Sequence, residues 1–215
     1  DIIERHKIER KDILEDILNT LSSLISSLTN PTNITNSIKS IKKEKLSSNT
    51  VSDYIEHCLD AFLISEAKRY DVKGKHYFEY PNKYYFVDIG LRNARLNFRQ
   101  FDPGHIMENI VYNELISRGY SVDIGVVVDR RNNANCQKEI DFVVNLGDKK
   151  MYIQSAWQMN TDKKINAELD SLKLTKDFFA KIIIQNDIPT TFTDEDGIIH
   201  CNLIEFLLNE TLLPM

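Results

Sequence analysis

Apolar residues recur at helical spacing in the first third of the chain. Apolar side chains three and four positions apart over residues 13–28 predict a first helix, which Thr29-Asn30-Pro31 should end. A shorter pattern over residues 34–41 predicts a second helix. In a third pattern, over residues 51–63, apolar side chains recur three, four, seven and eight positions after Val51, which is one face of a helix. Ser48-Asn49-Thr50 should begin that helix. The sequence therefore predicts a unit built on three helices.

A β-hairpin is predicted next. Tyr70-Asp71-Val72 and His76-Tyr77-Phe78 flank Lys73-Gly74-Lys75, which places glycine in the turn. The run Tyr84–Val87 reads as a further strand. Three helices followed by a hairpin predict a winged helix-turn-helix domain over residues 1–96.

The remainder of the chain, residues 97–215, alternates helical and strand patterns and predicts a second domain. Asp102-Pro103-Gly104 forms part of the connection. The expected elements are helices at 105–118, 162–174 and 203–208, and strands at 121–129, 138–146, 150–156, 181–184 and 197–201. The first six of these elements follow the order αβββαβ, and the mixture of helices and strands places the whole chain in the α/β (α+β) class.

Composition narrows the function classes. No apolar run approaches the ~20 residues of a membrane-spanning helix, so we expect a soluble, cytoplasmic protein without membrane contact. Three scattered cysteines indicate neither a disulfide framework nor a zinc site. With 7 glycines and no GxxxxGK[ST] motif, the chain lacks a phosphate-binding loop for ATP. Residues 1–100 carry a net charge of +2 and residues 101–215 a net charge of −7, which disfavours a general polyanion-binding surface on the second half.

Candidate chemistry centres on Asp141, within the apolar strand Lys138–Val144. Strand alternation places Glu139, Asp141 and Val143 on one face and the intervening apolar residues on the other. A carboxylate enclosed in this way needs a cation, a metal or several hydrogen bonds. Asp141 is therefore either a metal ligand or a hydrogen-bonded acid at a strand end.

Gln154 and Glu108 are the companions considered for Asp141. The Gln154 amide on the next strand can offer one oxygen to a hard cation such as Mg²⁺ or Mn²⁺, although a structural role is the alternative. Glu108 lies on the helix that precedes these strands and could complete an acidic cluster for metal binding and catalysis. Glu114 competes for that role, and a solvated helix acid is the other interpretation.

Basic residues of the hairpin indicate contact with nucleic acid. Lys68, Arg69, Lys73 and Lys75 alternate with aromatic side chains and could bind a phosphate backbone. The third helix, which would read DNA by its position, instead presents acids, among them Asp60. A protein contact or a plain scaffold therefore stays open beside DNA binding.

Four segments in order resemble one protein family. They are Asp1–Ile8, Lys83–Ala94, Glu108–Leu115 and Lys138–Val143, and they look like the C-terminal half of a group of prokaryotic AAA-type ATPases. In that group a P-loop ATPase module precedes a winged helix and a domain of unknown function related to the PD-(D/E)XK nucleases. The resemblance implies that ATP binds only in an ATPase module preceding Asp1, which would also be a partner of this region.

The resemblance also assigns roles to the candidate residues. It matches Glu108 to the acid of the first helix, Asp141 to the metal-binding aspartate and Gln154 to the first position of the (D/E)XK element. Ala156 stands where the nuclease pattern has lysine. The leading hypothesis is a binding and regulatory module with a degenerate nuclease-like site.

Two alternatives remain open. One is an active metal-dependent DNA endonuclease in which Lys138 or Lys163 replaces the missing lysine. The other is a protein-interaction scaffold that binds neither metal nor nucleic acid.

Overall fold

The computed structural model describes residues 2–42, 45–131 and 136–213 and divides into two compact units. The first unit comprises Asp1–Ala67 and Tyr80–Asn109, and the second comprises Lys68–Glu79 and Ile110–Met215. Helices and a mixed multi-stranded sheet are both present, so the predicted α/β class is confirmed.

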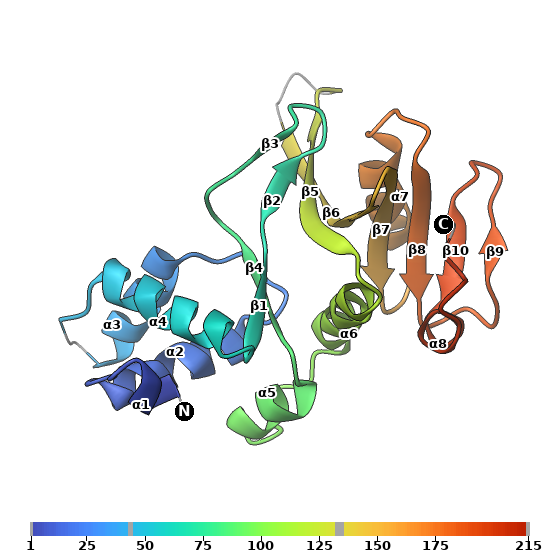
Figure 1. Cartoon of the computed structure of the whole chain (residues 1–215). Helices are drawn as coiled ribbons and strands as arrows, with labels where there is room; N and C mark the ends of the chain where they lie inside the picture. The colour runs from blue at the N-terminus through green and yellow to red at the C-terminus, as the bar shows by residue number, and fades with distance from the viewer. Residues whose placement is uncertain (1, 43–44, 132–135, 214–215) are drawn as a thin grey trace. The chain divides into compact units, whose positions relative to one another are not determined.

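Helices dominate the first unit. They are α1 (Ile2–Arg5), α2 (Lys11–Ser23), α3 (Pro31–Lys42), α4 (Ser48–Asp60) and α5 (Ile89–Arg95), and the unit also holds the start of α6 (Pro103–Ser117). Figure 1 shows α2, α3 and α4 gathered together. Their apolar faces form one core with residues such as Ile17, Ile34 and Val51, each fully buried. The three predicted helices are therefore present, and the Ser47 hydroxyl caps α4 by accepting the Thr50 backbone N–H.

The first helix ends five residues earlier than its apolar pattern predicts. Beyond Ser23 the chain turns through Ser26, which adopts a left-handed φ of 58°. The Ser26 N–H then bonds to the Tyr84 carbonyl, and Thr29 forms a β-bridge with Asn82. Ile25 is thus buried from a non-helical segment, whereas Leu28 at the end of the apolar pattern is exposed.

A two-stranded antiparallel ladder completes the first unit. It joins β1 (Ile64–Ala67) to β4 (Lys83–Phe86), with Ile64 opposite Phe86. All four residues of β4 are buried. The predicted strand at Tyr84–Val87 corresponds to β4, and its partner β1 was not predicted.

The second unit is built on an eight-stranded sheet of order β3-β2-β5-β6-β7-β8-β10-β9 (Figure 1). Its strands are β2 (Arg69–Asp71), β3 (His76–Tyr77), β5 (Ser121–Asp129), β6 (Cys136–Leu146), β7 (Lys149–Ala156), β8 (Ala180–Gln185), β9 (Phe192–Thr193) and β10 (Ile199–Asn202). The β5–β6–β7 ladders are antiparallel, whereas β8 pairs in parallel with β7 and with β10. Helix α7 (Asp162–Lys173) packs on β6 and β7, and α8 (Leu203–Leu208) packs on β8 and β10.

The predicted hairpin is present but belongs to this second unit. Tyr70 pairs with Tyr77 across β2 and β3, as the glycine turn predicts. However, β2 also pairs in parallel with β5, with Arg69 opposite Ile124, so the hairpin extends the large sheet. The expected domain boundary therefore differs from the division of the structure: the flanking strands β1 and β4 lie in the first unit, whereas β2 and β3 lie in the second. The position of the hairpin follows from backbone pairing between β2 and β5, which lie some fifty residues apart in the chain. The sequence of a strand does not by itself specify such a distant partner strand.

Candidate functional site

Asp141 and Gln154 meet where the ladder between β6 and β7 ends. The last regular pair is Phe142 with Ile153. At the next position the Gln154 Oε1 atom accepts the Asp141 backbone N–H at 2.6 Å, and the Asp141 Oδ2 atom accepts the Ser155 backbone N–H at 2.9 Å. Side chains thus replace the backbone ladder at this point, and the predicted pairing of Asp141 with Gln154 is realised in the structure.

Glu168 is a third member that sequence reasoning missed. It lies on α7, and its Oε2 atom accepts a hydrogen bond from the Gln154 Nε2 atom at 2.8 Å. Ile165, Leu169 and Leu172 pack from the same helix into the core of the second unit. Glu168 lies three residues after Ile165 and four before Leu172, so it occupies the side of the helix that faces the core. This spacing is the feature of the sequence that could have identified Glu168. Gln154, with 5% of its surface exposed, therefore joins a strand and a helix.

A β-bulge displaces Asp141 from simple strand alternation. Asp123 pairs with Val143 while Gly125 pairs with Ile140, so two residues of β6 lie opposite one residue of β5. A Cβ atom on Gly125 would lie 2.8 Å from the Ile140 Cβ atom and 2.9 Å from a Val143 methyl carbon. Ile140 and Val143 thus face the same core. The predicted division of β6 faces, with Val143 beside Asp141, is wrong because the bulge inserts an extra residue.

Glu108 lies in the first unit, 8% exposed, on the N-terminal part of α6. Its Oε1 atom accepts hydrogen bonds from the Lys83 Nζ atom at 2.9 Å and from the Tyr85 hydroxyl at 2.8 Å. The prediction that Glu108 shares one metal site with Asp141 and Gln154 concerns residues of different units and stays a prediction. Glu114, the competing acid, forms an ion pair with Arg118 at 2.8 Å.

Ala156, where the expected nuclease pattern would have lysine, is buried among apolar residues. Ala156 is 6% exposed and belongs to the core cluster of the second unit. The two substitutes considered, Lys138 and Lys163, form no ion pair with Asp141 within residues 2–42, 45–131 and 136–213. Lys163 is solvent-exposed near the start of α7. The relocated-lysine alternative gains no geometric support.

The Gln154 amide is engaged on both sides, which disfavours it as a ligand for a divalent metal. The Gln154 amide oxygen already accepts a backbone N–H, and its NH₂ group donates to the Glu168 carboxylate. A hard cation requires several oxygen atoms directed at one point, and an amide NH₂ facing a carboxylate opposes that arrangement. The group is chemically a hydrogen-bonded bridge between strand and helix.

A basic cavity is the second feature of this unit. It has a volume of about 790 Å³ and is lined by Asp71, Lys73, Gly74, Val128, Arg130, Arg131, Lys173, Leu174 and Lys176. Five of these nine residues are cations. They come from the hairpin turn, from the two residues that follow β5, and from the end of α7 and the segment that follows it. The cavity is thus assembled from three segments that lie far apart in the chain.

Two of the five cations are held by aspartates. Arg131 contacts Asp129 at 2.8 Å and Asp170 at 3.0 Å. The hydrogen bonds from Arg131 lower the pKa of Asp129 to about 2. Lys173 contacts Asp196 at 2.5 Å, and this hydrogen bond raises the pKa of the Lys173 ammonium.

The other three cations are Lys73, Arg130 and Lys176, each exposed. They form no ion pair within the part of the chain that the structure describes. They are therefore available to an anionic ligand.

The predicted nucleic-acid-binding residues of the hairpin have different environments. Lys73 lines the basic cavity, whereas exposed Lys68 and Lys75 do not. Arg69 donates to the Gln137 side chain at 2.7 Å, and its guanidinium lies 4.9 Å from the centre of the Phe78 ring. Arg69 therefore serves the packing of the hairpin.

Comparisons with known proteins give two domain matches. Residues 1–102 match the model of a domain of unknown function (DUF8612), and residues 103–203 match that of a second domain of unknown function (DUF4143). No solved structure matches this chain.

Two uncharacterized proteins are similar to this chain. The chain is 35% identical to an uncharacterized protein of Haemophilus influenzae over 162 residues, which are 75% of this chain and 38% of the relative. It is 30% identical to an uncharacterized protein of Methanocaldococcus jannaschii over 193 residues, which are 87% of this chain and 41% of the relative. The chain thus spans about two fifths of the length of either relative.

Within the described residues, no helix combines the length and the apolar character needed to cross a membrane.

Proposed function

We propose that this chain is the C-terminal region of an AAA-type ATPase and that it binds the phosphate backbone of DNA without cleaving it. The second matched domain is typical of such C-terminal regions, and both relatives are more than twice as long as the aligned part. In this proposal the ATPase module lies outside the chain, and ATP acts there. The winged helix and the nuclease-like domain are the fold assignments that accompany it.

The basic cavity carries the proposal. Lys73, Arg130 and Lys176 contribute three unpaired positive charges around one concave surface, with Arg131 and Lys173 beside them. Phosphate contact is the dominant source of nucleic-acid affinity, and it requires cations in such an arrangement. No aromatic side chain lines the cavity within the described residues, so base stacking is not expected there. The proposal therefore concerns backbone binding without sequence preference.

The bridge at Gln154 supports the absence of hydrolysis. Metal-dependent cleavage needs carboxylate oxygens free to hold the ion and a group that orients water. Here the Gln154 amide bonds Asp141 and Glu168 into the fold, and Ala156 supplies no ammonium. The nuclease-like architecture would then serve for recognition.

Fluorescence anisotropy with a short labelled DNA duplex tests this function. The test variant combines Lys73→Glu, Arg130→Glu and Lys176→Glu, and the matched control combines Lys149→Glu, Lys163→Glu and Lys164→Glu. All six side chains are exposed on the second unit, and both variants change the net charge equally. We expect the cavity variant to weaken binding by roughly tenfold or more, since reversal of three phosphate contacts removes most of the local attraction. The control should bind within a few-fold of the wild type.

Two results would contradict the proposal. Equal loss in the cavity variant and in the control would show that only net charge matters. Cleavage of the duplex with Mn²⁺, abolished by Asp141→Ala, would instead establish the endonuclease alternative.

A further inference from the structure

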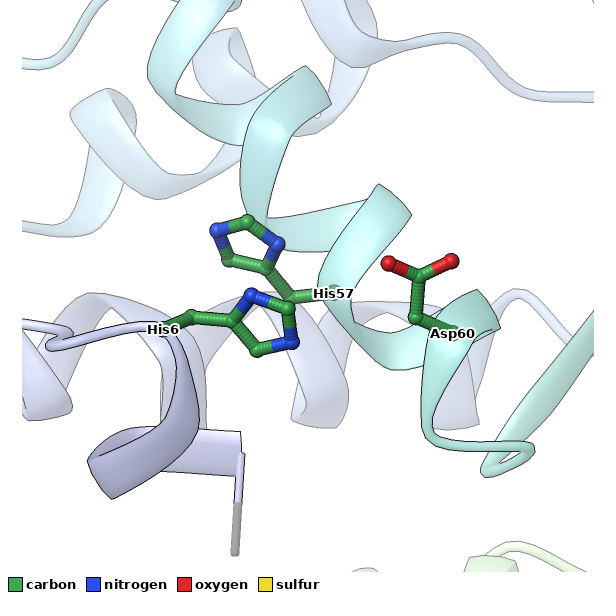
Figure 2. Close-up of side chains that lie close together, drawn as sticks. All are labelled: His6, His57 and Asp60. Atoms are coloured by element: carbon green, nitrogen blue, oxygen red, sulfur yellow. The ribbon is translucent and has the colours of Figure 1, made fainter.

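Two imidazoles and a carboxylate converge on the surface of the first unit. Figure 2 shows His6, which follows α1, beside His57 and Asp60 on α4. One ligand atom from each residue lies within 4.8 Å of those of the other two. His57 and Asp60 are three residues apart and so occupy the same side of the helix.

Core packing on either side fixes these positions. Val51, Ile55 and Cys58 direct the inner face of α4 into the core, which turns His57 and Asp60 toward the chain that leaves α1. Ile8 is buried in the same core, and Ile2 and Ile3 pack against it. Apolar residues that pack on the core therefore precede and follow His6 in the chain, and this packing places the His6 ring against α4.

The three groups have unused bonding capacity. The His6 Nε2 atom is buried and has no hydrogen-bond partner. A buried polar atom without a partner is uncommon and costly, and it calls for a ligand. The side chains of His57 and Asp60 form neither a hydrogen bond nor an ion pair with any described residue. Within the described residues, the His6 ring stacks on the His57 ring, with 3.8 Å between the ring centres and 13° between the ring planes.

We propose that His6, His57 and Asp60 form a binding site for a divalent transition-metal ion of the zinc class. Two imidazole nitrogens and one carboxylate oxygen are ligands that suit Zn²⁺, Co²⁺ and Ni²⁺, and water completes the coordination. Because such ions hold their ligands at about 2.0–2.1 Å, the three ligand atoms must approach to about 3.3 Å from one another. Imidazole lone pairs lie in the ring plane, so one ring leaves the stack when the ion binds.

The consequence is local stabilisation. His6 belongs to the segment that joins α1 to α2, whereas His57 and Asp60 belong to α4. An ion held by both segments binds the folded unit in preference to the unfolded chain and raises its stability by mass action. The site is independent of the proposed DNA-binding cavity, since its residues belong to the other unit.

Calorimetric titration of the 215-residue chain with Zn²⁺ tests the site. The test variants are His6→Gln, His57→Gln and Asp60→Asn. The matched control is His105→Gln, because His105 pairs with Asp102 and belongs to the same unit outside the cluster. We expect one Zn²⁺ per chain in the wild type and in His105→Gln, with affinity lower by more than roughly tenfold in each histidine variant. Zn²⁺ should also raise the thermal midpoint of the wild type, and this rise should disappear in the histidine variants.

Co²⁺ absorption and NMR give readouts that do not depend on stability. Co²⁺ should produce d–d bands in the wild type, and the imidazole signals of His6 and His57 should be the histidine signals that shift. Asp60 is exposed, so Asp60→Asn should fold normally and still show weakened binding. Absence of Zn²⁺ binding by the wild type, or equal binding by the wild type and both histidine variants, would overturn the proposal.

Discussion

Gln154 shows how a single amide can occupy a position that sequence reasoning assigns to a metal ligand. Both ends of its side chain are engaged, the oxygen by the Asp141 N–H and the nitrogen by the Glu168 carboxylate. An amide is both donor and acceptor, whereas a carboxylate in its place would face Glu168 with like charge. The chemistry of glutamine therefore explains how this strand end is joined to α7.

Gln154→Leu should lower the free energy of unfolding by about 1–3 kcal/mol, because it removes the buried hydrogen bonds of the Gln154 amide to the Asp141 N–H and to the Glu168 carboxylate. Urea denaturation measures the change. Gln158→Leu is the matched control, since Gln158 is exposed and forms no hydrogen bond with a described residue. A loss no larger than that of the control would show that the bridge does not stabilise the fold.

The bulge in β6 is the element that sets the environment of Asp141. The extra residue lies between Ile140 and Val143. On the neighbouring strand, Gly125 packs closely against the side chains of both residues. Bulges bend a strand and redirect its side chains. Here the bulge directs two apolar residues three apart into one core, and it releases Asp141 to bond the next strand.

We predict that Gly125→Ala destabilises the second unit by roughly 1–3 kcal/mol, since the added methyl overlaps Ile140 and Val143 within a packed core. Thermal and urea unfolding give the measurement. Gly104→Ala makes a suitable comparison, because its Cβ would meet only the Asp102 carboxylate at an ordinary 3.6 Å. Equal stability of the two variants would refute the steric role of Gly125.

The basic cavity is a local cluster of positive charge on a molecule whose net charge is negative. The chain has a net charge of −5, and its second half is the more acidic. Long-range attraction to DNA is therefore weak, and any binding depends on the few cations that the fold brings together.

Salt dependence measures how many cations take part. Three phosphate contacts, by Lys73, Arg130 and Lys176, predict a slope of about −2.7 for log K against log salt, which is roughly a 40-fold loss between 50 and 200 mM. Anisotropy titrations over this range give the slope. The cavity variant should flatten it. A much steeper slope in the wild type would indicate a broader contact surface, and no salt dependence would contradict phosphate binding.

Local pattern determined most of the secondary structure of this protein. Apolar periodicity and turn residues predicted β5 and α8 at their observed bounds, and α7 within one residue, because side-chain period and capping act over a few neighbouring positions. The same local reasoning identified Asp141 and Gln154 as a pair, since strands joined by the turn at Gly147 bring them together.

Only the tertiary structure decided which distant segments meet. The hairpin β2–β3 pairs with β5, Glu168 reaches Gln154, and Lys73, Arg130 and Lys176 line one cavity. His6 lies against His57 some fifty residues away for the same reason. Sheet edges and surface side chains have many compatible partners, and the choice among them follows from the packing of the whole core, which no short stretch of sequence contains.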